Sequence, residues 1–209
     1  MVGQGVLREC LLDSGVTSVL SISRSRTGGE DPKLRVAVHS DFLDFSALES
    51  QLSGFDACFF CLGVTSAGMT EQDYTRVTHG YTLAAAETLA RLNPQMTFVY
   101  VSAIGADSSE RGRMMWARVR GKTENALLRL PFKAVYIFRP AGIAPLHGER
   151  SRTWLTRFSY TIIGPLLPLL QYTFPRYITT TEQLGRAMLK VARSGASKRV
   201  IESADINSI

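Results

Sequence analysis

Cysteine is scarce in this sequence, with three residues in 209, which excludes a disulfide framework and favours a reducing compartment. Long uninterrupted apolar runs are lacking too. The longest charge-free apolar stretch, residues 158–174, contains Gly164, Pro165 and Pro168, so it is too broken for a comfortable membrane span. The first residues do not follow the pattern of a signal peptide. We therefore expect a soluble, cytoplasmic protein.

The overall composition is that of a globular protein. Hydrophobic residues make up 45% of the chain and charged residues 20%, which excludes wholesale disorder. The net charge of +6 is compatible with nucleic acid, acidic lipid or a phosphorylated small molecule as a partner. A basic series accompanies the helix expected at 114–130; it consists of Arg111, Arg113, Arg118, Arg120 and Lys122. Because no nucleic-acid-binding module goes with it, we interpret it as a solvated helix face and expect no nucleic-acid partner.

Apolar runs alternate along the chain with segments of helical periodicity. Strands are predicted at residues 16–23, 34–39, 56–62, 97–102 and 134–138. Helices are predicted at residues 2–13, 44–52, 72–92, 114–130 and 182–194. The run at 56–62, DACFFCL, is typical of a strand covered on both faces. Alternation of this kind predicts an α/β fold, a Rossmann-like doubly wound parallel sheet. We expect one domain over residues 1–209, with a small C-terminal elaboration at about 143–180 on the substrate side.

Several fragments together resemble a known family. They are MVGQGVLRECLL, CLGVTSAG, FVYVSAIGAD, WARVRGKTENALL, FRPAGIAPLHG and YITTTEQLGRAML. In this order they resemble the atypical short-chain dehydrogenase/reductases, and within these the NAD-dependent epimerase/dehydratase-like proteins related to the human Tat-interacting oxidoreductase-like protein. The resemblance covers essentially the whole chain. It implies a Rossmann-like fold, a nicotinamide dinucleotide cofactor and oxidoreductase or epimerase chemistry on a small molecule.

The beginning of the chain departs from the family pattern. The family's phosphate-binding turn reads approximately G-A-T-G-M-V-G after a first strand, and of its glycines only Gly3 is present here. Two explanations are open. The natural protein begins about a dozen residues upstream, with that strand and the missing glycines, or it is naturally truncated. Gly3 is expected to permit close packing of the first helix rather than to touch the diphosphate.

The remaining cofactor candidates follow the strands. Ser23 and Arg24 come after the second family strand, and the nearest acid downstream of them is Glu30. Arginine accommodates a ribose 2′-phosphate whereas an acid binds the 2′-hydroxyl, so we favour NADP over NAD; a solvated basic loop is the alternative. The resemblance adds residues around the adenosine and nicotinamide halves: Asp41, Phe42, Leu62, Gly63, Arg120 and Pro140.

The catalytic positions of the family are altered in this chain. Short-chain dehydrogenases use a tyrosine, a lysine four residues later on the same helix, and a serine after the preceding strand. Aligned on WARVRGK, these positions hold Trp116, Arg120 and Ala103. Tryptophan has no proton to exchange near neutral pH, and arginine does not replace lysine without consequence. The standard acid/base is therefore missing, and the candidates to rebuild it are Ser102, Lys122 and His147.

Two further features of the sequence bear on function. Cys58 and Cys61 have C-x-x-C spacing, but inside a strand residues three apart point to opposite faces, so we expect neither a redox nor a metal site. The apolar segment 158–174 is expected to cover the substrate, to mediate self-association or to lie in a membrane interface. The leading hypothesis is an NAD(P)-binding protein with non-classical catalysis or a cofactor-dependent regulatory role. The alternatives are an active NADP-dependent oxidoreductase or epimerase on an apolar or lipid-like substrate, and a scaffold without nucleotide.

Overall fold

The computed structural model describes residues 1–26, 29–146 and 178–209. Two compact units share these residues. The first comprises residues 1–39, 140–193 and 202–209, and the second comprises residues 40–139 and 194–201. A single domain over the whole chain stays a prediction.

The second unit is built on a four-stranded sheet with the order β3-β4-β5-β8. Its strands are β3 (Ala57–Phe60), β4 (Thr97–Val101), β5 (Ala134–Arg139) and β8 (Val200–Glu202). Strands β3, β4 and β5 pair in parallel, which requires a crossover helix between each pair. Strands β4 and β5 supply most of the core, in which Phe98, Val99, Ile137 and Phe138 are fully buried.

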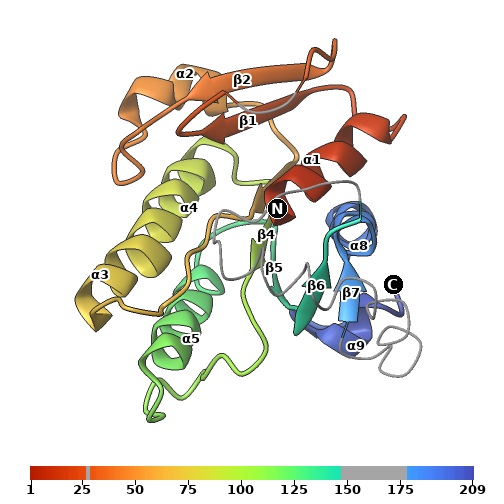
Figure 1. The fold of residues 1–209 in the computed structure, drawn as a ribbon. Helices are drawn as coiled ribbons and strands as arrows, with labels where there is room; N and C mark the ends of the chain where they lie inside the picture. Colours follow the sequence, from red (N-terminus) through yellow and green to blue (C-terminus); the bar gives the residue numbers. More distant parts are fainter. Residues whose placement is uncertain (27–28, 147–177) are drawn as a thin grey trace. The chain divides into compact units, whose positions relative to one another are not determined.

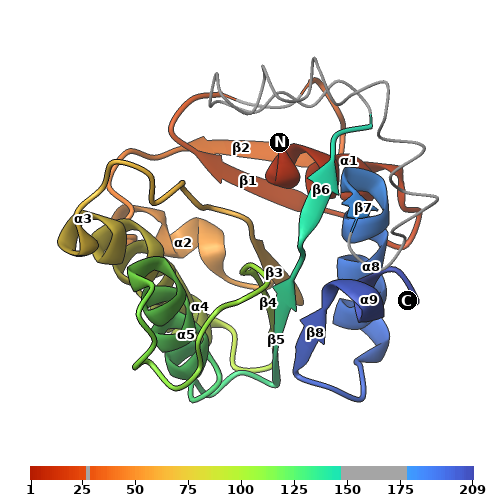
Figure 2. The same ribbon diagram turned by 60° about the horizontal axis from the view of Figure 1, so that its bottom comes forward.

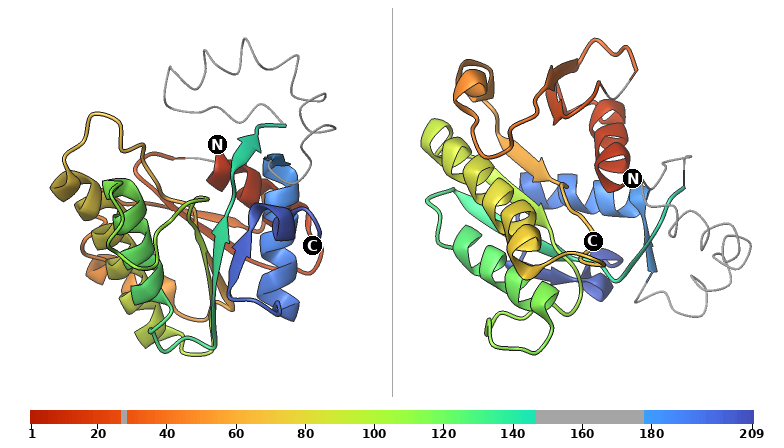
Figure 3. Two further views of the ribbon diagram at one scale, coloured as in Figure 1. Left: turned by 90° about the horizontal axis from the view of Figure 1, so that it is seen from below. Right: turned by 60° about the vertical axis from the view of Figure 1, so that its left-hand side comes forward.

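Helices α4 (Tyr81–Leu92) and α5 (Met115–Leu127) are the two crossovers of this unit. They contact each other and lie on one side of the sheet (Figure 2). The shorter elements of the unit are η1 (Ser46–Leu48), α2 (Glu49–Leu52), α3 (Glu71–Thr75) and the π-helical segment η2 (Arg76–Gly80). Figure 3 shows α4 and α5 running side by side. Since both helices follow strands of a parallel sheet, the loops that precede them begin at the carboxyl ends of β3 and β4.

The first unit contains two short parallel sheets and the helices beside them. One sheet pairs β1 (Val19–Ser23) with β2 (Leu34–Val38), and the other pairs β6 (Gly142–Ala144) with β7 (Ile178–Thr180). Its helices are α1 (Val2–Leu12), α8 (Thr181–Ser194) and α9 (Ser203–Ile206). Figure 1 shows α1 beside β1, with which it is in contact.

Helices α1 and α8 approach closely at glycines. A Cβ atom on Gly5 would lie 2.6 Å from the Cβ of Thr181, and one on Gly185 would lie 2.8 Å from the Cγ of Glu9. Gly3, in contrast, is exposed. The close approach of α1 to α8 is made at Gly5, two residues later on the buried side of α1. The packing role expected for Gly3 stays a prediction.

The helix predicted at 72–92 is interrupted. It begins as α3, passes through the π-helical segment at Arg76–Gly80 and continues as α4. At this point the Thr82 hydroxyl donates a 2.6 Å hydrogen bond to the carbonyl of Thr78, and His79 lies 3.4 Å from the Thr123 hydroxyl of α5. Side-chain bonds to the backbone compete with the regular helical pattern, and π-helical turns are common near functional sites.

Two other expectations differ from the structure. Within β3 only Phe60 is buried, so the strand is not covered on both faces in the described residues, where it pairs with β4 alone. Strands β6, β7 and β8 and helix α9 were not predicted, because segments of three or four residues carry no measurable periodicity. The other predicted strands and helices are present with ends shifted by a few residues.

Candidate functional site

The carboxyl ends of β4 and β5 carry polar residues of the second unit, among them Ser102 that the sequence analysis named. Ligands of open α/β sheets bind outside the carboxyl ends of the strands. Ser102 follows β4 directly, Arg139 ends β5, and the helix α5 that runs between these strands carries Trp116 and Arg120. This end of the sheet is therefore the candidate site within the second unit.

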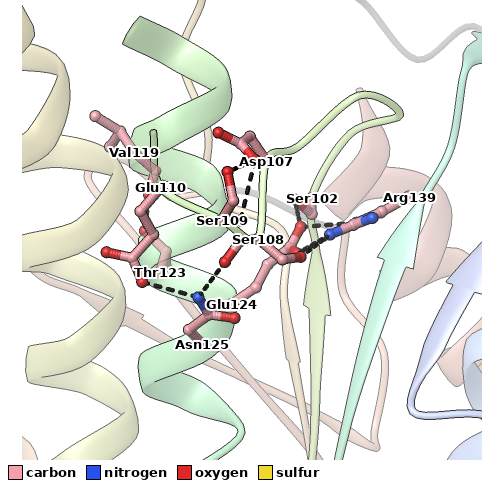
Figure 4. Close-up of polar contacts among 10 residues, drawn as sticks. All are labelled: Ser102, Asp107, Ser108, Ser109, Glu110, Val119, Thr123, Glu124, Asn125 and Arg139. Carbon is pink, nitrogen blue, oxygen red and sulfur yellow. Dashed lines mark hydrogen bonds and ion pairs between the residues drawn. The ribbon is translucent and has the colours of Figure 1, made fainter. Parts of the chain in front are cut away.

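A buried ion pair lies at this end of the sheet, as Figure 4 shows. Glu124 of α5 is 1% exposed and pairs with the guanidinium of Arg139, whose side chain is 12% exposed. The Nε of Arg139 donates to both carboxylate oxygens of Glu124, at 3.1 and 3.2 Å. The buried hydroxyl of Ser102 donates to the same carboxylate. A buried carboxylate needs such partners, because an unpaired charge in the interior is strongly unfavourable.

The ion pair also fixes the loop that leads from β4 to α5. Arg139 donates a 2.9 Å hydrogen bond to the hydroxyl of Ser108, and Asn125 of α5 donates to the Ser108 carbonyl at 2.9 Å and to Glu110 at 2.8 Å (Figure 4). Glu110 has a positive φ of 62°, a conformation that non-glycine residues adopt rarely. Several partners thus hold the loop in one conformation.

Asp107 organises the inside of this loop. Its carboxylate accepts hydrogen bonds from the backbone N–H groups of Ser109, Arg111 and Gly112, at 3.0, 3.1 and 2.6 Å. These bonds and that from the Ser109 hydroxyl, which contributes most, hold the pKa of Asp107 below its usual range. On the other side, a Cβ on Gly121 of α5 would lie 1.7 Å from the Asp107 carbonyl oxygen. The loop therefore rests directly on the helix backbone, and only glycine fits there.

The structure places Trp116 and Arg120 on α5, with Trp116 in the first turn. The Trp116 ring lies beside Gly105, where a Cβ would come within 3.3 Å of the indole, and Gly105 has a φ of 81°. Arg120 donates from Nε to the hydroxyl of Tyr74, at 3.0 Å. A Cβ on Gly63, just after β3, would be 3.9 Å from the Nη2 atom of Arg120. Two predicted cofactor residues, Gly63 and Arg120, are thus neighbours.

The three candidates for replacement catalysis lie in different surroundings. Ser102 is 5% exposed and donates to Glu124, so its hydroxyl is engaged in the interior. Lys122 is exposed on α5 and Ala103 is half-buried. His147 lies outside the described residues. The catalytic roles of Ser102 and Lys122 stay predictions.

Two predicted adenosine residues belong to the loop after β2. Phe42 is 6% exposed and packs against the rings of Phe45 and Tyr81, each with centroids 5.9 Å away. Asp41 accepts a 3.0 Å hydrogen bond from the backbone N–H of Leu43, a local bond within this loop. Leu62 is half-buried beside Gly63. The structure does not test whether Asp41, Phe42 or Leu62 contacts a ligand.

The other cofactor candidates lie in the first unit. Arg24 is exposed, and Ser23 donates a 2.7 Å hydrogen bond to the carbonyl of Ser25. Pro140 is buried and Gly3 is exposed. Their roles toward a dinucleotide stay predictions.

Of the three cysteines Cys10 is buried, whereas Cys58 and Cys61 are half-buried. Cys58 lies in β3 and Cys61 one residue beyond it, and none of the three cysteines is in a disulfide. Burial raises the pKa of the Cys58 thiol to about 12 and is the main cause that raises that of Cys10 to about 11. The described residues contain no group of three or more histidine, cysteine or acidic side chains placed to hold a metal ion. None of the described helices is long and apolar enough to cross a membrane, and the apolar segment 158–174 lies outside the described residues.

Sequence reasoning missed Glu124 and Tyr74. Glu124 follows WARVRGK on the predicted helix, and the 3.6-residue period places it on the same face as Arg120 and Gly121. That placement was a usable signal, because an acid on the buried face of a helix requires a basic partner. Tyr74 carried no such signal, since its partner Arg120 is 46 residues away.

No protein-family model matches the chain. Among curated proteins, the chain is 29% identical over 160 residues to Protein HTATIP2 of Rattus norvegicus, covering 74% of this chain and 64% of that protein. It is 28% identical over 159 residues to Protein FMP52-2, mitochondrial, of Scheffersomyces stipitis, covering 75% of this chain and 65% of that protein. The matches thus span slightly less than two thirds of these relatives' length.

Solved structures share the fold at low identity. One is the enzyme WbmF of Bordetella bronchiseptica in complex with NAD+, with a TM-score of 0.68 and 16% identity over 99% of this chain and 73% of that one. Another is an oxidoreductase of the short-chain dehydrogenase/reductase family from Burkholderia thailandensis, with a TM-score of 0.69 and 14% identity over 98% and 87%. The resemblance to the atypical short-chain dehydrogenase/reductases is confirmed. The predicted Rossmann-like α/β fold is confirmed with it.

The predicted cytoplasmic location is contradicted. Several relatives of the FMP52 group are named as mitochondrial proteins, including one from Eremothecium gossypii that matches 100% of this chain at 28% identity. Low cysteine content and the absence of a leader pattern do not separate the cytoplasm from other reducing compartments. This is why composition alone gave the wrong location.

Proposed function

We propose that this chain binds a nicotinamide dinucleotide, with NADPH preferred over NADH, and that it lacks the tyrosine-dependent hydride transfer of short-chain dehydrogenases. Support for the cofactor comes from WbmF, which shares the fold and was solved with NAD+ and with NADH. Support for NADPH comes from Arg24, an exposed cation where an NAD-specific site has an acid.

Part of the second unit fits such a ligand chemically. Arg120 presents its guanidinium near Gly63, whose lack of a side chain leaves the backbone open at the end of β3. A guanidinium forms strong, directed hydrogen bonds with phosphate oxygens and with ribose hydroxyls. When bound, the dinucleotide would supply or accept a hydride. This chain's own residues would bind and orient it.

One observation carries the proposed loss of classical catalysis, namely the surroundings of Trp116. Its indole occupies the position of the family's tyrosine and packs on Gly105. The indole N–H donates a hydrogen bond but does not exchange a proton near neutral pH. With Arg120 in place of lysine and Ala103 in place of serine, no group at these three positions moves a proton. We therefore favour a regulatory role that depends on the bound cofactor, or non-classical chemistry.

A second candidate function is an active NADPH-dependent oxidoreductase or epimerase acting on an apolar substrate. It is favoured by exposed apolar side chains in the loops after β3 and β4 and at the start of α5. These are Val64, Ile104 and Met114, with exposed fractions of 36%, 42% and 59%. A third possibility, a scaffold without nucleotide, corresponds to a failure of the binding test below.

The test is a calorimetric titration with NADPH and NADH, on this chain and on a version extended by the residues encoded upstream of Met1. We expect micromolar binding of NADPH by at least one version, with NADH weaker, and a loss of this preference in Arg24→Ala. Lack of binding by both versions at millimolar cofactor would overturn the proposed function.

A second assay distinguishes a protein that has lost classical catalysis from an active oxidoreductase. NADPH oxidation is followed with a panel of aromatic aldehydes and quinones, for the natural chain and for the triple variant A103S/W116Y/R120K. We expect background rates for the natural chain and measurable oxidation for the triple variant, which restores the serine, tyrosine and lysine positions. Turnover by the natural chain would instead support the active oxidoreductase.

A further inference from the structure

Arg120 is held by a buried tyrosine that lies far from it in the sequence. The hydroxyl of Tyr74, on α3, accepts a 3.0 Å hydrogen bond from the Nε of Arg120. Tyr74 is 1% exposed, so its ring is fixed by packing within the second unit, whereas Arg120 is half-buried. A flexible side chain tied at Nε to a fixed hydroxyl loses most of its rotamer freedom. Tyr74 therefore sets the direction of the guanidinium.

The charge of Arg120 is not balanced by a carboxylate in the described residues. Two acids on the same helices as the pair are engaged elsewhere: Glu71 of α3 pairs with Arg118, and Glu124 of α5 pairs with Arg139. Tyr74 is the hydrogen-bond partner of Arg120 in this part of the chain and occupies Nε alone. Within residues 1–26, 29–146 and 178–209 the two terminal nitrogens of Arg120 have no hydrogen-bond partner, and Nη2 lies 3.9 Å from where a Cβ of Gly63 would be. A half-buried cation without a counter-ion is stabilised by an anionic ligand.

We propose that Tyr74 is a positioning residue for Arg120, and that the pair forms an anion-binding arm that holds a phosphate group of the dinucleotide at the end of β3. This inference rests on the proposed dinucleotide binding. Arginine suits the arrangement because its guanidinium has separate donors for the tyrosine and for the ligand. A lysine at this position would offer a single ammonium group for both.

The burial of Tyr74 also decides its role. At 1% exposure the hydroxyl does not reach solvent or a substrate, so Tyr74 does not replace the missing catalytic tyrosine. Its contribution is made through Arg120. Removing its hydroxyl is therefore expected to weaken ligand binding only as long as Arg120 is present.

The experiment is a double-mutant cycle measured by calorimetry with two probes, NADPH and inorganic pyrophosphate. The variants are Tyr74→Phe, Arg120→Gln and the double variant, with Arg120→Lys as a charge-preserving change. Tyr81→Phe is the matched control, because it removes a phenol hydroxyl from the neighbouring helix for which the described residues show no hydrogen bond. Circular dichroism and urea midpoints confirm that each variant is folded.

We expect Arg120→Gln to weaken binding of both probes at least about tenfold, and Tyr74→Phe about three- to tenfold. The double variant should bind no more weakly than Arg120→Gln alone, within about twofold, because the hydroxyl acts only through the guanidinium. Arg120→Lys should weaken binding of the probes about as much as Tyr74→Phe does. Adding Tyr74→Phe to Arg120→Lys should weaken binding no further. Arg120→Gln should also reduce the salt dependence of binding, and Tyr81→Phe should match the natural chain.

The outcomes distinguish this inference from the proposed function. If the natural chain binds NADPH but Tyr74→Phe has no effect, or its effect adds fully to that of Arg120→Gln, the positioning role is refuted and dinucleotide binding stands. If Tyr74→Phe does not fold, Arg120→Lys is compared with the natural chain instead, and unchanged binding by Arg120→Lys refutes the positioning role. If the natural chain binds pyrophosphate through Arg120 but not NADPH, the arm stands and the proposed function fails. Binding of neither probe overturns both.

Discussion

Replacing Glu124 by glutamine should destabilise the second unit more than any other single loss of charge in its described part. The change keeps the size of the side chain but removes the negative charge that faces Arg139. Glu124 is 1% exposed and the Arg139 side chain 12%, so water cannot take over the lost interaction. The Ser102 hydroxyl, which donates to the same carboxylate, loses a charged acceptor as well.

The magnitude follows from the burial of the two partners. Removing one member of a buried ion pair costs about 3–5 kcal/mol, because the other charge is left uncompensated. Arg139 keeps its hydrogen bond to Ser108, so we expect the lower end, about 3 kcal/mol, or about a hundredfold in the folding equilibrium. The exposed pair Glu71–Arg118, with the Glu71 side chain 51% exposed, provides the control. Glu71→Gln should cost less than about 1 kcal/mol.

The assay is urea denaturation followed by circular dichroism and tryptophan fluorescence, for both variants and for Glu124→Gln combined with Arg139→Met. The double variant should be more stable than Glu124→Gln alone, because it no longer contains an unpaired buried cation. Equal losses for Glu124→Gln and Glu71→Gln would refute the reasoning. So would a double variant that is less stable than the single one.

Two further predictions concern the loop on α5 and the thiols of Cys10 and Cys58. Gly121→Ala should lower the free energy of unfolding by about 2–3 kcal/mol, because the new Cβ would lie 1.7 Å from the Asp107 carbonyl oxygen. Lys122→Ala, at the adjacent exposed position, should change the free energy of unfolding by less than about 0.5 kcal/mol. Similar urea midpoints for the two variants would contradict this prediction. Cys10 and Cys58, with thiol pKa values raised to about 11 and about 12, should resist iodoacetamide at pH 8 in the native protein, because the reactive thiolate forms only as pH approaches these values. Mass spectrometry should find both labelled rapidly in urea, and fast labelling of either in the native state would show that its burial is misjudged.

The fold could be predicted well wherever the hydrophobic pattern is long. Strands β4 and β5 are near-continuous apolar runs, and α5 and α8 have a clear helical period, so their existence and type followed from the residues. The π-helical segment at Arg76–Gly80 could not be predicted, since its cause is a set of contacts made by Thr78, His79 and Thr82 with their surroundings. The very short strands were missed for lack of pattern.

The site could be predicted only in part. The altered positions Trp116 and Arg120 followed from the motif WARVRGK, because their spacing is local. The interactions that these side chains and their neighbours make depend on how α3, α5 and β5 pack together. Arg139 is 15 residues from Glu124, and Tyr74 is 46 residues from Arg120. A single sequence does not indicate which side chains so far apart in the chain will pair. The same limit applies to Gly5, whose need for close approach is set by Thr181.

The most direct test of the account is the NADPH titration of this chain and of its upstream-extended version, with the triple variant A103S/W116Y/R120K assayed beside them. We expect micromolar NADPH binding without oxidation of the cofactor by the natural residues, and oxidation once serine, tyrosine and lysine are restored. Catalytic turnover by the natural chain, or no dinucleotide binding by either version, would contradict it.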